Sequence, residues 1–470
     1  MMLRILKQYY PIRNVFFVIG EGLMIYLAVF TAVYIVRGYT DVFMNLQIAL
    51  KVALFTFVCQ TILYYNDLYN IKQVDSFGEL TIRLLQGLGF TCIFLAIVYF
   101  VFPGTLIASG IFILAVGLVF LFIAGWRFWY MIILDRGMFN QNIILVGSGD
   151  LSKQITNEIK SRKDIGYKIV ASIPIKIEKS ASAGYEKDSQ KTETSDQPQI
   201  GDLLRMANQN NVTSVIVALD EKRGCFPTQE LLACRVKGID VIEGNSFFEM
   251  LKGKLIVSQL SPSWLIFSKG FEKTFFEKLV KRALDTSLSL VLGILTAPLI
   301  ALVMLLIKLD SKGPVIYSQE RVGRHRKPVR IYKFRSMIQD AEKASGPQWA
   351  EEEDPRITRV GRIIRKLRID EIPQLWNVIK GNMSMVGPRP ERQFFVEQLE
   401  KTIPFYKERF TVKPGLTGWA QIRYAYGASE DDAEEKLNFD LFYIKNMSIL
   451  FDLVIIFNTV KIVLFGTGAR

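Results

Sequence analysis

The sequence has little of what most side-chain nucleophiles and metal sites need. Its 470 residues include a single histidine, His325, and four cysteines. One histidine removes most Ser-His and Cys-His catalytic pairs and most histidine metal sites. The cysteines show no CxxC and no paired spacing, so neither a zinc site nor a disulfide framework is expected. This cysteine usage is typical of a reduced compartment.

Acidic residues are also too few to balance the basic ones. The chain has 58 Lys and Arg against 45 Asp and Glu, a net charge of +13, and half of its residues are hydrophobic. The hydrophobic share is typical of a protein partly in a membrane. The basic balance fits nucleic acid, an anionic membrane surface or phosphorylated substrates. No cleavable signal peptide is expected, because no small-residue cleavage site follows the first apolar run.

Long apolar runs fill the first third of the chain, at about 14–36, 46–65, 84–102 and 107–134. Each approaches the roughly 20 residues that cross a bilayer. Buried core helices are the alternative, which four such runs in succession disfavour. Basic residues precede the first run, lie between the second and third, and close the fourth, so the positive-inside rule places both ends in the cytoplasm. Residues 1–139 are therefore predicted to form a four-helix transmembrane bundle.

The pattern changes at Gln141. NIILVGSGDLSKQITNEI predicts a strand, a glycine turn and a helix, and VTSVIVAL (212–219) and GIDVIEG (238–244) predict further buried parallel strands. These elements indicate a Rossmann-like α/β domain over about 140–256. A full GxGxxG would need glycine where Ser152 stands, so a bound nucleotide and a vestigial loop in a scaffold domain both stay open. The polar stretch 176–199 is expected to be disordered.

A further apolar run covers 287–307 and is long enough to cross a membrane. A crossing would put residues 309–470 on the opposite side from the Rossmann-like domain. Pro298 lies in the middle of the run, where it removes a helix hydrogen bond and kinks the helix. Both flanks are basic, which favours the same side for both ends. Residues 270–312 are therefore predicted to form a re-entrant membrane helix kinked at Pro298.

An adjacent acid pair, Asp370 and Glu371, lies in the strongly basic stretch around LRIDEIPQLW (367–376). Arginine forks match phosphate oxygens, one carboxylate plus substrate phosphates is a usual magnesium site, and a carboxylate can attack phosphorus. These residue types indicate phosphoryl transfer, but by themselves they leave a neutralised surface pair open. Nucleic acid is disfavoured by the acids and by the five membrane-length segments.

Four motifs carry a specific resemblance: KFRSM (333–337), DPRITRVGRIIRK (354–366), DEIPQLWNVIKGNMSMVGPRPER (370–392) and KPGLTGWAQI (413–422). Together they resemble the bacterial monotopic-type phosphoglycosyl transferases, which move a sugar 1-phosphate onto polyprenyl phosphate. The resemblance covers about 270–470. The four-helix and Rossmann-like front resembles the large members that begin exopolysaccharide or O-antigen synthesis. IRYAYGAS (422–429) resembles the subgroup associated with PEP-CTERM/exosortase loci.

The resemblance implies a small α/β catalytic domain at 313–470 with interfacial helices, on the cytoplasmic face of the inner membrane. It implies that Asp370 attacks the β-phosphate of a UDP-sugar with Mg²⁺ beside it, that UMP leaves, and that polyprenyl (undecaprenyl) phosphate takes up the phosphosugar. Glu371 matches the acidic partner of the nucleophile, and Pro298 matches the helix-breaking proline. The positions that match phosphate- and nucleotide-binding residues are Lys333, Arg335, Arg365, Pro388, Arg389 and Pro390.

The sequence departs from the family pattern at two places. Ala297 precedes Pro298 where a serine is usual, and Arg368 stands where the common Ser-Leu-Asp-Glu has serine, which adds a cation beside the acid pair. The final run, 447–466, carries Asp452, Asn458 and Lys461, so an interfacial helix is expected there. The sugar, the polyprenyl chain length and homodimerisation stay open.

Two other hypotheses were weighed. A membrane NAD-dependent nucleotide-sugar dehydratase shares the four-helix and Rossmann-like front, but its chemistry needs a Tyr-x-x-x-Lys pair and a full glycine fingerprint. The sequence contains no YxxxK. A non-catalytic scaffold of a polysaccharide assembly is the third hypothesis.

Overall fold

The computed structural model describes residues 2–5, 8–38, 45–69, 77–105, 107, 110–137, 140–162, 165–174, 200–219, 226–260, 270, 273–339, 354–424, 427 and 429–465. The predicted disordered stretch at 176–199 lies outside these residues. The chain divides into two compact units, one made of Met1–Leu3 with Tyr10–Phe247 and the other of Arg4–Tyr9 with Phe248–Arg470. Short strands β1 (Met2–Ile5) and β2 (Gln8–Pro11) open the chain.

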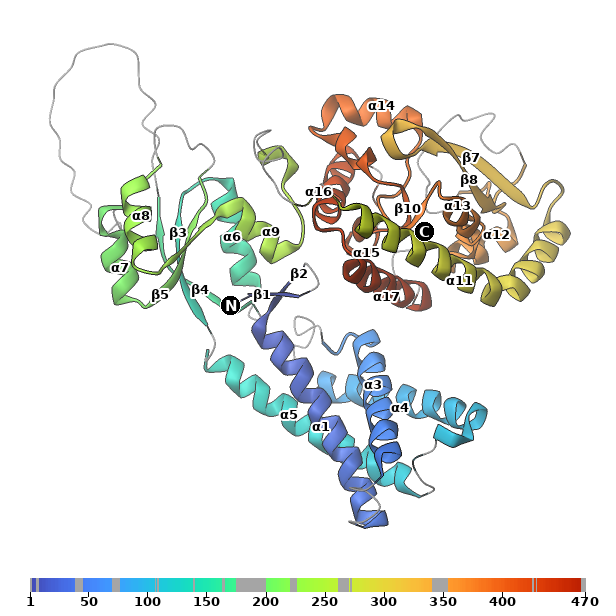
Figure 1. Ribbon diagram of the computed structural model, residues 1–470, viewed down its shortest axis with the longest axis horizontal. Coiled ribbons are helices and arrows are strands. Elements are labelled where there is room, and N and C mark those ends of the chain that lie inside the picture. Colours follow the sequence, from blue (N-terminus) through green and yellow to red (C-terminus); the bar gives the residue numbers. More distant parts are fainter. Residues whose placement is uncertain are drawn as a thin grey trace. The chain divides into compact units, whose positions relative to one another are not determined.

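Four long helices form the first part of the first unit (Figure 1): α1 (Ile12–Arg37), α3 (Leu46–Tyr65), α4 (Phe77–Val101) and α5 (Ile111–Asp135). They share one apolar cluster, to which Ile25, Val52, Leu84 and Ile123 contribute one from each helix. Each is long and apolar enough to cross a membrane. The several apolar helices expected here are confirmed, and they fit a membrane protein.

A buried ion pair ties α1 to α5. Arg127 Nε lies 2.6 Å from Glu21 Oε1, and both side chains are almost fully buried. Arg127 also donates from Nη1 to the carbonyl of Leu68, at 2.9 Å, just after α3. A charged pair this deep among apolar helices is stable only when its partners are in place, so it fixes which helix faces meet.

A four-stranded parallel sheet follows, in the order β4-β3-β5-β6. Its strands are β3 (Gln141–Val146), β4 (Tyr167–Ile173), β5 (Val212–Val217) and β6 (Asp240–Glu243), and its helices are α6 (Asp150–Ser161), α7 (Leu203–Gln209), α8 (Thr228–Val236) and α9 (Gly244–Lys252). Helices α7 and α8 cover one face and α6 covers the other (Figure 1). The three predicted strands are confirmed. Strand β4 was not predicted, because it is an edge strand and only Ile173 in it is fully buried.

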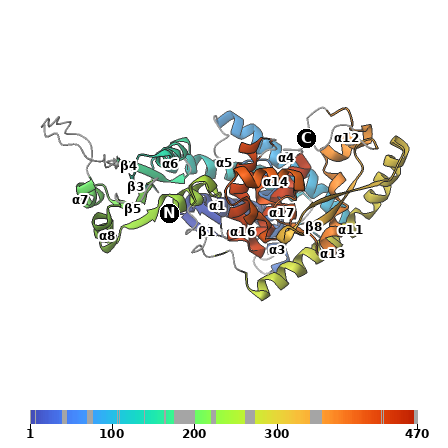
Figure 2. The same ribbon diagram turned by 90° about the horizontal axis from the view of Figure 1, so that it is seen from above.

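The second unit contains the longest helix, α11 (Phe275–Asp310), which includes Pro298. A capping box starts it, because Thr274 and Glu277 bond each other's backbone N–H groups. Both views show α11 changing direction along its length (Figures 1 and 2). Most of its apolar residues are exposed, among them Leu290, Val291, Ile294, Leu295, Leu302 and Leu305.

Most of the remaining chain folds against one apolar core, and Phe334 and Ile364 pack with Val303 and Ile307 of α11 in a second, smaller one. The stretch GPVIYSQERVGRHRKPVRIYKFRSM (313–337) predicts a strand pair that carries basic residues. Strands β7 (Ile316–Val322) and β8 (Pro328–Phe334) form this pair as an antiparallel hairpin, and β9 (Ser384–Val386) pairs in parallel with β10 (Gly415–Thr417). The helices are α12 (Arg359–Lys366), η7 (Ile369–Glu371), α13 (Gln374–Lys380), α14 (Gln393–Thr402), η8 (Tyr406–Thr411), α15 (Trp419–Arg423), α16 (Glu430–Asn446) and α17 (Ile449–Phe465).

Helix α17 packs one face on this core. Asp452 is fully buried and its Oδ2 lies 2.6 Å from Lys281 Nζ of α11, while Tyr443 donates to its Oδ1 at 2.8 Å. The opposite face exposes Leu450, Leu453, Val460 and Leu464. Asp452, one of the polar residues that disfavour a spanning helix at 447–466, is therefore a buried residue that bonds α17 to α11 and to Tyr443.

Candidate active site

The acid pair lies on the short helix η7, in the second unit. Arg368 precedes it with φ of 55°, a left-handed conformation that turns the chain sharply between α12 and η7. Asp370 and Glu371 are both buried, with 12% and 10% of their side chains exposed. This burial argues against a surface acid pair neutralised by its neighbours.

Two cations reach the acid pair from other segments. Lys333 Nζ, on β8, lies 2.8 Å from Glu371 Oε1 and 3.8 Å from Asp370 Oδ2. Arg389 Nη2 also lies 2.8 Å from Glu371 Oε1. Glu371 thus holds two charge-assisted hydrogen bonds, whereas Asp370 pairs with Lys333 at longer range. The arrangement leaves Asp370 as the carboxylate with capacity to react.

The two carboxyl groups have opposite electrostatic environments. Burial raises the pKa of Asp370 to about 6, although Lys333 acts against it. Burial also disfavours the ionised form of Glu371, but Arg389 and Lys333 outweigh it and hold the pKa of Glu371 below its usual range. Near neutral pH both groups are mostly ionised, and Asp370 keeps the higher basicity of the two.

Backbone packing brings the KFRSM segment to the acid pair. Gly361 of α12 lies so close to Ser336 that a Cβ on it would meet the Ser336 carbonyl oxygen at 2.0 Å. The Thr358 N–H donates to the same carbonyl, at 3.1 Å. On the other side, Asn377 of α13 accepts from Tyr332 N–H at 3.1 Å and donates to the Arg330 carbonyl at 2.7 Å. Strand β8 is therefore fixed between the helices that precede and follow η7.

The Arg389 loop is held by the KPGLTGWAQI segment. Gly387 N–H donates to the Thr417 carbonyl and Gly415 N–H to the Pro388 carbonyl, each at 2.9 Å. A Cβ on Gly387 would meet the Lys413 carbonyl at 2.5 Å, so glycine is needed for this close approach. The motifs GPRPER and KPGLTGWAQI are separate in sequence, and the parallel pairing of β9 and β10 joins them.

The structure brings together four of the predicted site residues: Lys333, Asp370, Glu371 and Arg389. Arg365 lies close enough to lower the pKa of Asp370 slightly. Pro388 is buried and Pro390 half-buried on either side of Arg389.

Two of the predicted residues lie in other surroundings. Arg335 donates from Nη2 to the Ser311 carbonyl and hydroxyl at the end of α11, at 2.8 and 2.9 Å. Pro298 lies inside α11 and makes no part of the acid-pair geometry.

Sequence reasoning missed Arg409, which is buried behind the Arg389 loop. Its Nη2 donates to the Arg389 carbonyl at 3.1 Å and to Asp440 Oδ2 at 2.9 Å. The nearby carboxylate and the Tyr406 hydroxyl overcome the cost of burial and raise the pKa of Arg409. Arg409 therefore supports the backbone that carries Arg389. No motif pointed to it, because it lies between the resembling segments.

The donor set of the described residues fits one mode of magnesium binding. No cluster of three or more His, Cys, Asp or Glu side chains occurs within the described residues, so a cage made entirely by protein is not present there. Within the described part of the acid-pair site, Asp370 is the carboxylate that cations do not saturate. That fits a magnesium ion held by one carboxylate and completed by substrate phosphates and water.

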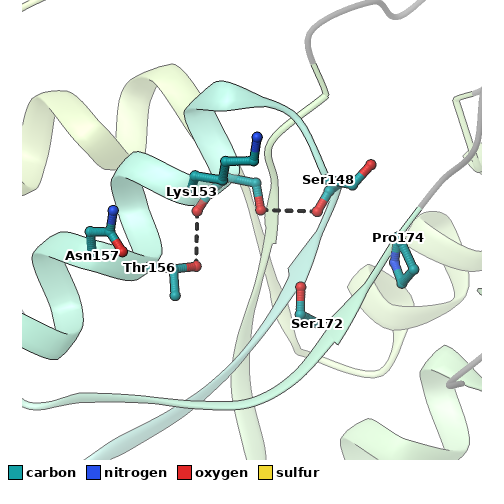
Figure 3. Close-up of a pocket in the computed structure, with 8 residues that line it drawn as sticks. Ser148, Lys153, Thr156, Asn157, Ser172 and Pro174 are labelled. Atoms are coloured by element: carbon teal, nitrogen blue, oxygen red, sulfur yellow. Dashed lines mark hydrogen bonds between the residues drawn. The ribbon is translucent and has the colours of Figure 1, made fainter.

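The first unit has a separate cavity of about 530 Å³ at the glycine turn (Figure 3). Its lining residues are Gly147, Ser148, Ser152, Lys153, Thr156, Asn157, Ser172 and Pro174. The Ser152 hydroxyl donates to the Gly147 carbonyl and the Thr156 hydroxyl to the Ser152 carbonyl, each at 2.9 Å (Figure 3). Ser152, which stands where GxGxxG has its third glycine, thus bonds the backbone of the glycine turn.

Comparison with known proteins identifies the second unit's relatives. The family described as "Bacterial sugar transferase" matches residues 276–466. The chain is 42% identical over 240 residues to an Aeromonas hydrophila UDP-N-acetylgalactosamine-undecaprenyl-phosphate N-acetylgalactosaminephosphotransferase, covering 51% of the chain and 56% of that protein. It is 32% identical over 336 residues to a Komagataeibacter xylinus undecaprenyl-phosphate glucose phosphotransferase, covering 70% of the chain and 60% of that protein.

A shorter relative is matched over almost its whole length. This exopolysaccharide production protein PSS, from Rhizobium leguminosarum bv. phaseoli, is 43% identical over 186 residues, which is 38% of the chain and 93% of the relative. The chain spans 56% and 60% of the length of the two longer relatives. The family match at residues 276–466 contains the acid pair, its cations and all but the first residue of α11.

Proposed function

The chain belongs to the bacterial sugar transferase family, and from that premise we propose that it transfers a sugar 1-phosphate from a UDP-sugar to polyprenyl (undecaprenyl) phosphate. The proposed reaction releases UMP and starts exopolysaccharide or O-antigen synthesis at the inner membrane. The observation that carries the proposal is the buried Asp370, less tightly paired than its neighbour Glu371 and set among Lys333 and Arg389.

In the first step, a carboxylate oxygen of Asp370 attacks the β-phosphorus of the UDP-sugar. A bond forms between that oxygen and phosphorus, and the bond from phosphorus to the bridging oxygen of the diphosphate breaks. The electron pair leaves with UMP, and a phosphosugar remains on Asp370 as an acyl phosphate ester. The raised pKa of Asp370 supports this role, since basicity favours attack while the group is still ionised near pH 7.

In the second step, an oxygen of polyprenyl phosphate attacks the same phosphorus. The bond from phosphorus to the Asp370 oxygen breaks, which restores the carboxylate and yields polyprenyl diphosphate sugar. Lys333 and Arg389 balance negative charge through both steps, because phosphoryl transfer is catalysed mainly by positioning and charge neutralisation. Glu371 holds these two cations in place through its hydrogen bonds.

Mg²⁺ is the proposed cofactor. Asp370 would hold it together with the donor's phosphates, consistent with the single unsaturated carboxylate of the site. When bound, the ion supplies neutralisation of the diphosphate charge.

A re-entrant course for α11 is also proposed. A straight helix of its 36 residues would be about 54 Å long, well above the roughly 30 Å thickness of the hydrocarbon core of a bilayer. Near its start, Arg282 donates to the Val378 and Ile379 carbonyls of α13, at 2.6 and 2.7 Å. At its end, Ser311 accepts from Arg335, next to β8.

Helix α13 and strand β8 are bonded to each other through Asn377. Both ends of α11 therefore contact one folded body, while its middle exposes apolar side chains. That combination supports entry and exit on the same membrane face. It keeps the acid pair on the cytoplasmic side, where nucleotide sugars are made. The exposed face of α17 supports an interfacial position.

The test is a screen of UDP-sugars for UMP release by membranes that contain the full chain, undecaprenyl phosphate and Mg²⁺. We expect release with at least one UDP-hexose or UDP-N-acetylhexosamine, and none with Asp370→Asn. Release by Asp370→Asn at the wild-type rate would contradict the assignment. The dehydratase alternative is not favoured, because the family match lies over the acid pair and not over the glycine turn.

A further inference from the structure

The last turn of α11 is bonded to both segments that lead to the acid pair. Asp310 Oδ2 accepts the Val360 N–H at the start of α12, at 3.1 Å. The adjacent Ser311 accepts from Arg335, which directly follows β8. Helix α12 runs on into η7 with Asp370, and β8 carries Lys333. Side-chain hydrogen bonds thus connect the end of α11 directly to both of these segments.

The first half of α11 is bonded to the strand that leads to Arg389. Asp285 Oδ1 accepts the Met385 N–H of β9 at 3.2 Å, and Lys281 Nζ lies 3.4 Å from the Val386 carbonyl. Asp285 is buried, with 4% of its surface exposed. Strand β9 ends at Val386, and the Arg389 loop begins there.

We propose that Asp310 and Asp285 are positioning residues that hold the two halves of the active site in register on α11. Asp310 acts through α12 on Asp370, and Asp285 acts through β9 on Arg389. The inference rests on the proposed function. It adds that the membrane-embedded helix sets the distance between the attacking carboxylate and the arginine of the phosphate loop.

The two positions have different expected effects on kinetics. A misplaced nucleophile slows the chemical step without weakening donor binding, whereas a misplaced Arg389 weakens donor binding. Shifts of about 1 Å in such groups can cost about 100-fold in rate. A purely structural role would lower the amount of folded enzyme and leave both kinetic parameters of the remainder unchanged.

The experiment is single-turnover UMP release by the purified full chain, without acceptor, over a series of UDP-sugar concentrations. Asp310→Ala is expected to lower the plateau rate by about 10- to 100-fold with a half-saturating concentration within threefold of wild type. Asp285→Ala is expected to raise the half-saturating concentration by about tenfold or more. Asp310→Asn and Asp285→Asn keep an acceptor oxygen, so both are expected to recover most of the loss.

Glu277→Ala is the matched control. Glu277 also accepts a backbone N–H, that of Thr274 at 2.9 Å, but at the start of α11 and outside the acid-pair and Arg389 segments. The plateau rate and the half-saturating concentration of Glu277→Ala are expected to equal those of wild type. If Asp285→Ala does not fold, the comparison of Asp310→Ala with Asp310→Asn decides alone, because Asp310 is only half-buried.

Three results would overturn the inference while leaving the proposed function intact: alanine variants with wild-type parameters, alanine variants in which rate and half-saturation change together, or asparagine variants no better than alanine. A wild-type chain that releases UMP from no UDP-sugar would instead overturn the proposed function, and the inference with it.

Discussion

Arg389 Nη2 donates a 2.8 Å hydrogen bond to Glu371 Oε1. The two residues are 18 positions apart in sequence, and the bond ties Arg389 to the carboxylate next to the proposed nucleophile. Because Lys333 bonds the same oxygen, Glu371 is committed to holding cations. Asp370 is thereby left for chemistry.

Replacement of Arg389 should weaken donor binding. Arg389→Ala leaves Glu371 with Lys333 alone and removes one phosphate partner, a loss of about 2 kcal/mol or more, or about 30-fold in the half-saturating UDP-sugar concentration. Arg389→Lys keeps the charge but lacks the planar guanidinium that bonds two phosphate oxygens, so a smaller loss of donor binding is expected. The rate of UMP release over a series of UDP-sugar concentrations gives the half-saturating concentration of both variants. Equal half-saturation in Arg389→Ala and wild type would remove Arg389 from the binding site.

The rate of the first step should fall in acid. The pKa of Asp370 is raised to about 6, and the attacking form is the carboxylate, so the rate should fall about tenfold per pH unit below 6 and level off above 7. Lys333 lowers this pKa, so Lys333→Gln should move the acid limb to higher pH. The measurement is UMP release without acceptor, because the lipid phosphate itself titrates near pH 6. An acid limb that stays at the same pH in Lys333→Gln would contradict this assignment.

Arg368 should influence the choice of donor. Burial and the neighbouring Arg389 lower the pKa of Arg368, while Glu371 and Asp370 act in the opposite direction, so this guanidinium adds a further positive charge near the acid pair. Arg368→Asn removes the charge in a residue type that tolerates φ of 55°, so the turn is kept. We expect rate ratios between UDP-sugars to change by about three- to tenfold, the size of one polar contact.

Arg368→Val places a β-branched residue in the same left-handed turn and provides the comparison. It should lower thermal stability through strain of about 1–2 kcal/mol. If both variants retain the wild-type ratios, Arg368 has no part in substrate preference.

Removal of magnesium should stop the reaction without unfolding the protein. No group of three or more His, Cys, Asp or Glu side chains that could hold a metal occurs within the described residues, so the ion is expected to bind with the donor. Excess EDTA should abolish UMP release and Mg²⁺ should restore it, while the unfolding temperature of the ligand-free chain stays constant. A drop in that temperature with EDTA would instead indicate a structural metal.

The sequence predicts the elements better than it predicts their contacts. Long apolar runs, the β7–β8 hairpin and three of the four sheet strands follow from periodicity and length. Strand β4 was not predicted, because an edge strand with one fully buried residue leaves no apolar run in the sequence. Its place in the sheet depends on pairing with β3, which is a tertiary property.

The site was predictable where one motif carries the residue. Asp370, Glu371, Lys333 and Arg389 come together as the resemblance implies. The phosphate-binding role of Arg335 stays a prediction, and its Nη2 bond to Ser311 was not predictable because it depends on the end of α11 lying beside β8. Arg409 was not predictable, because its role depends on burial behind a loop.

A burst experiment tests whether Asp370 forms the proposed covalent intermediate. The purified full chain is mixed with Mg²⁺ and an accepted UDP-sugar in the absence of polyprenyl phosphate, and UMP is quantified against enzyme. We expect a burst of about one UMP per chain, a matching phosphosugar mass on the peptide containing Asp370, and loss of at least about 10³-fold in burst rate for Asp370→Asn. UMP that appears only after acceptor is added, with no mass on that peptide, would contradict it.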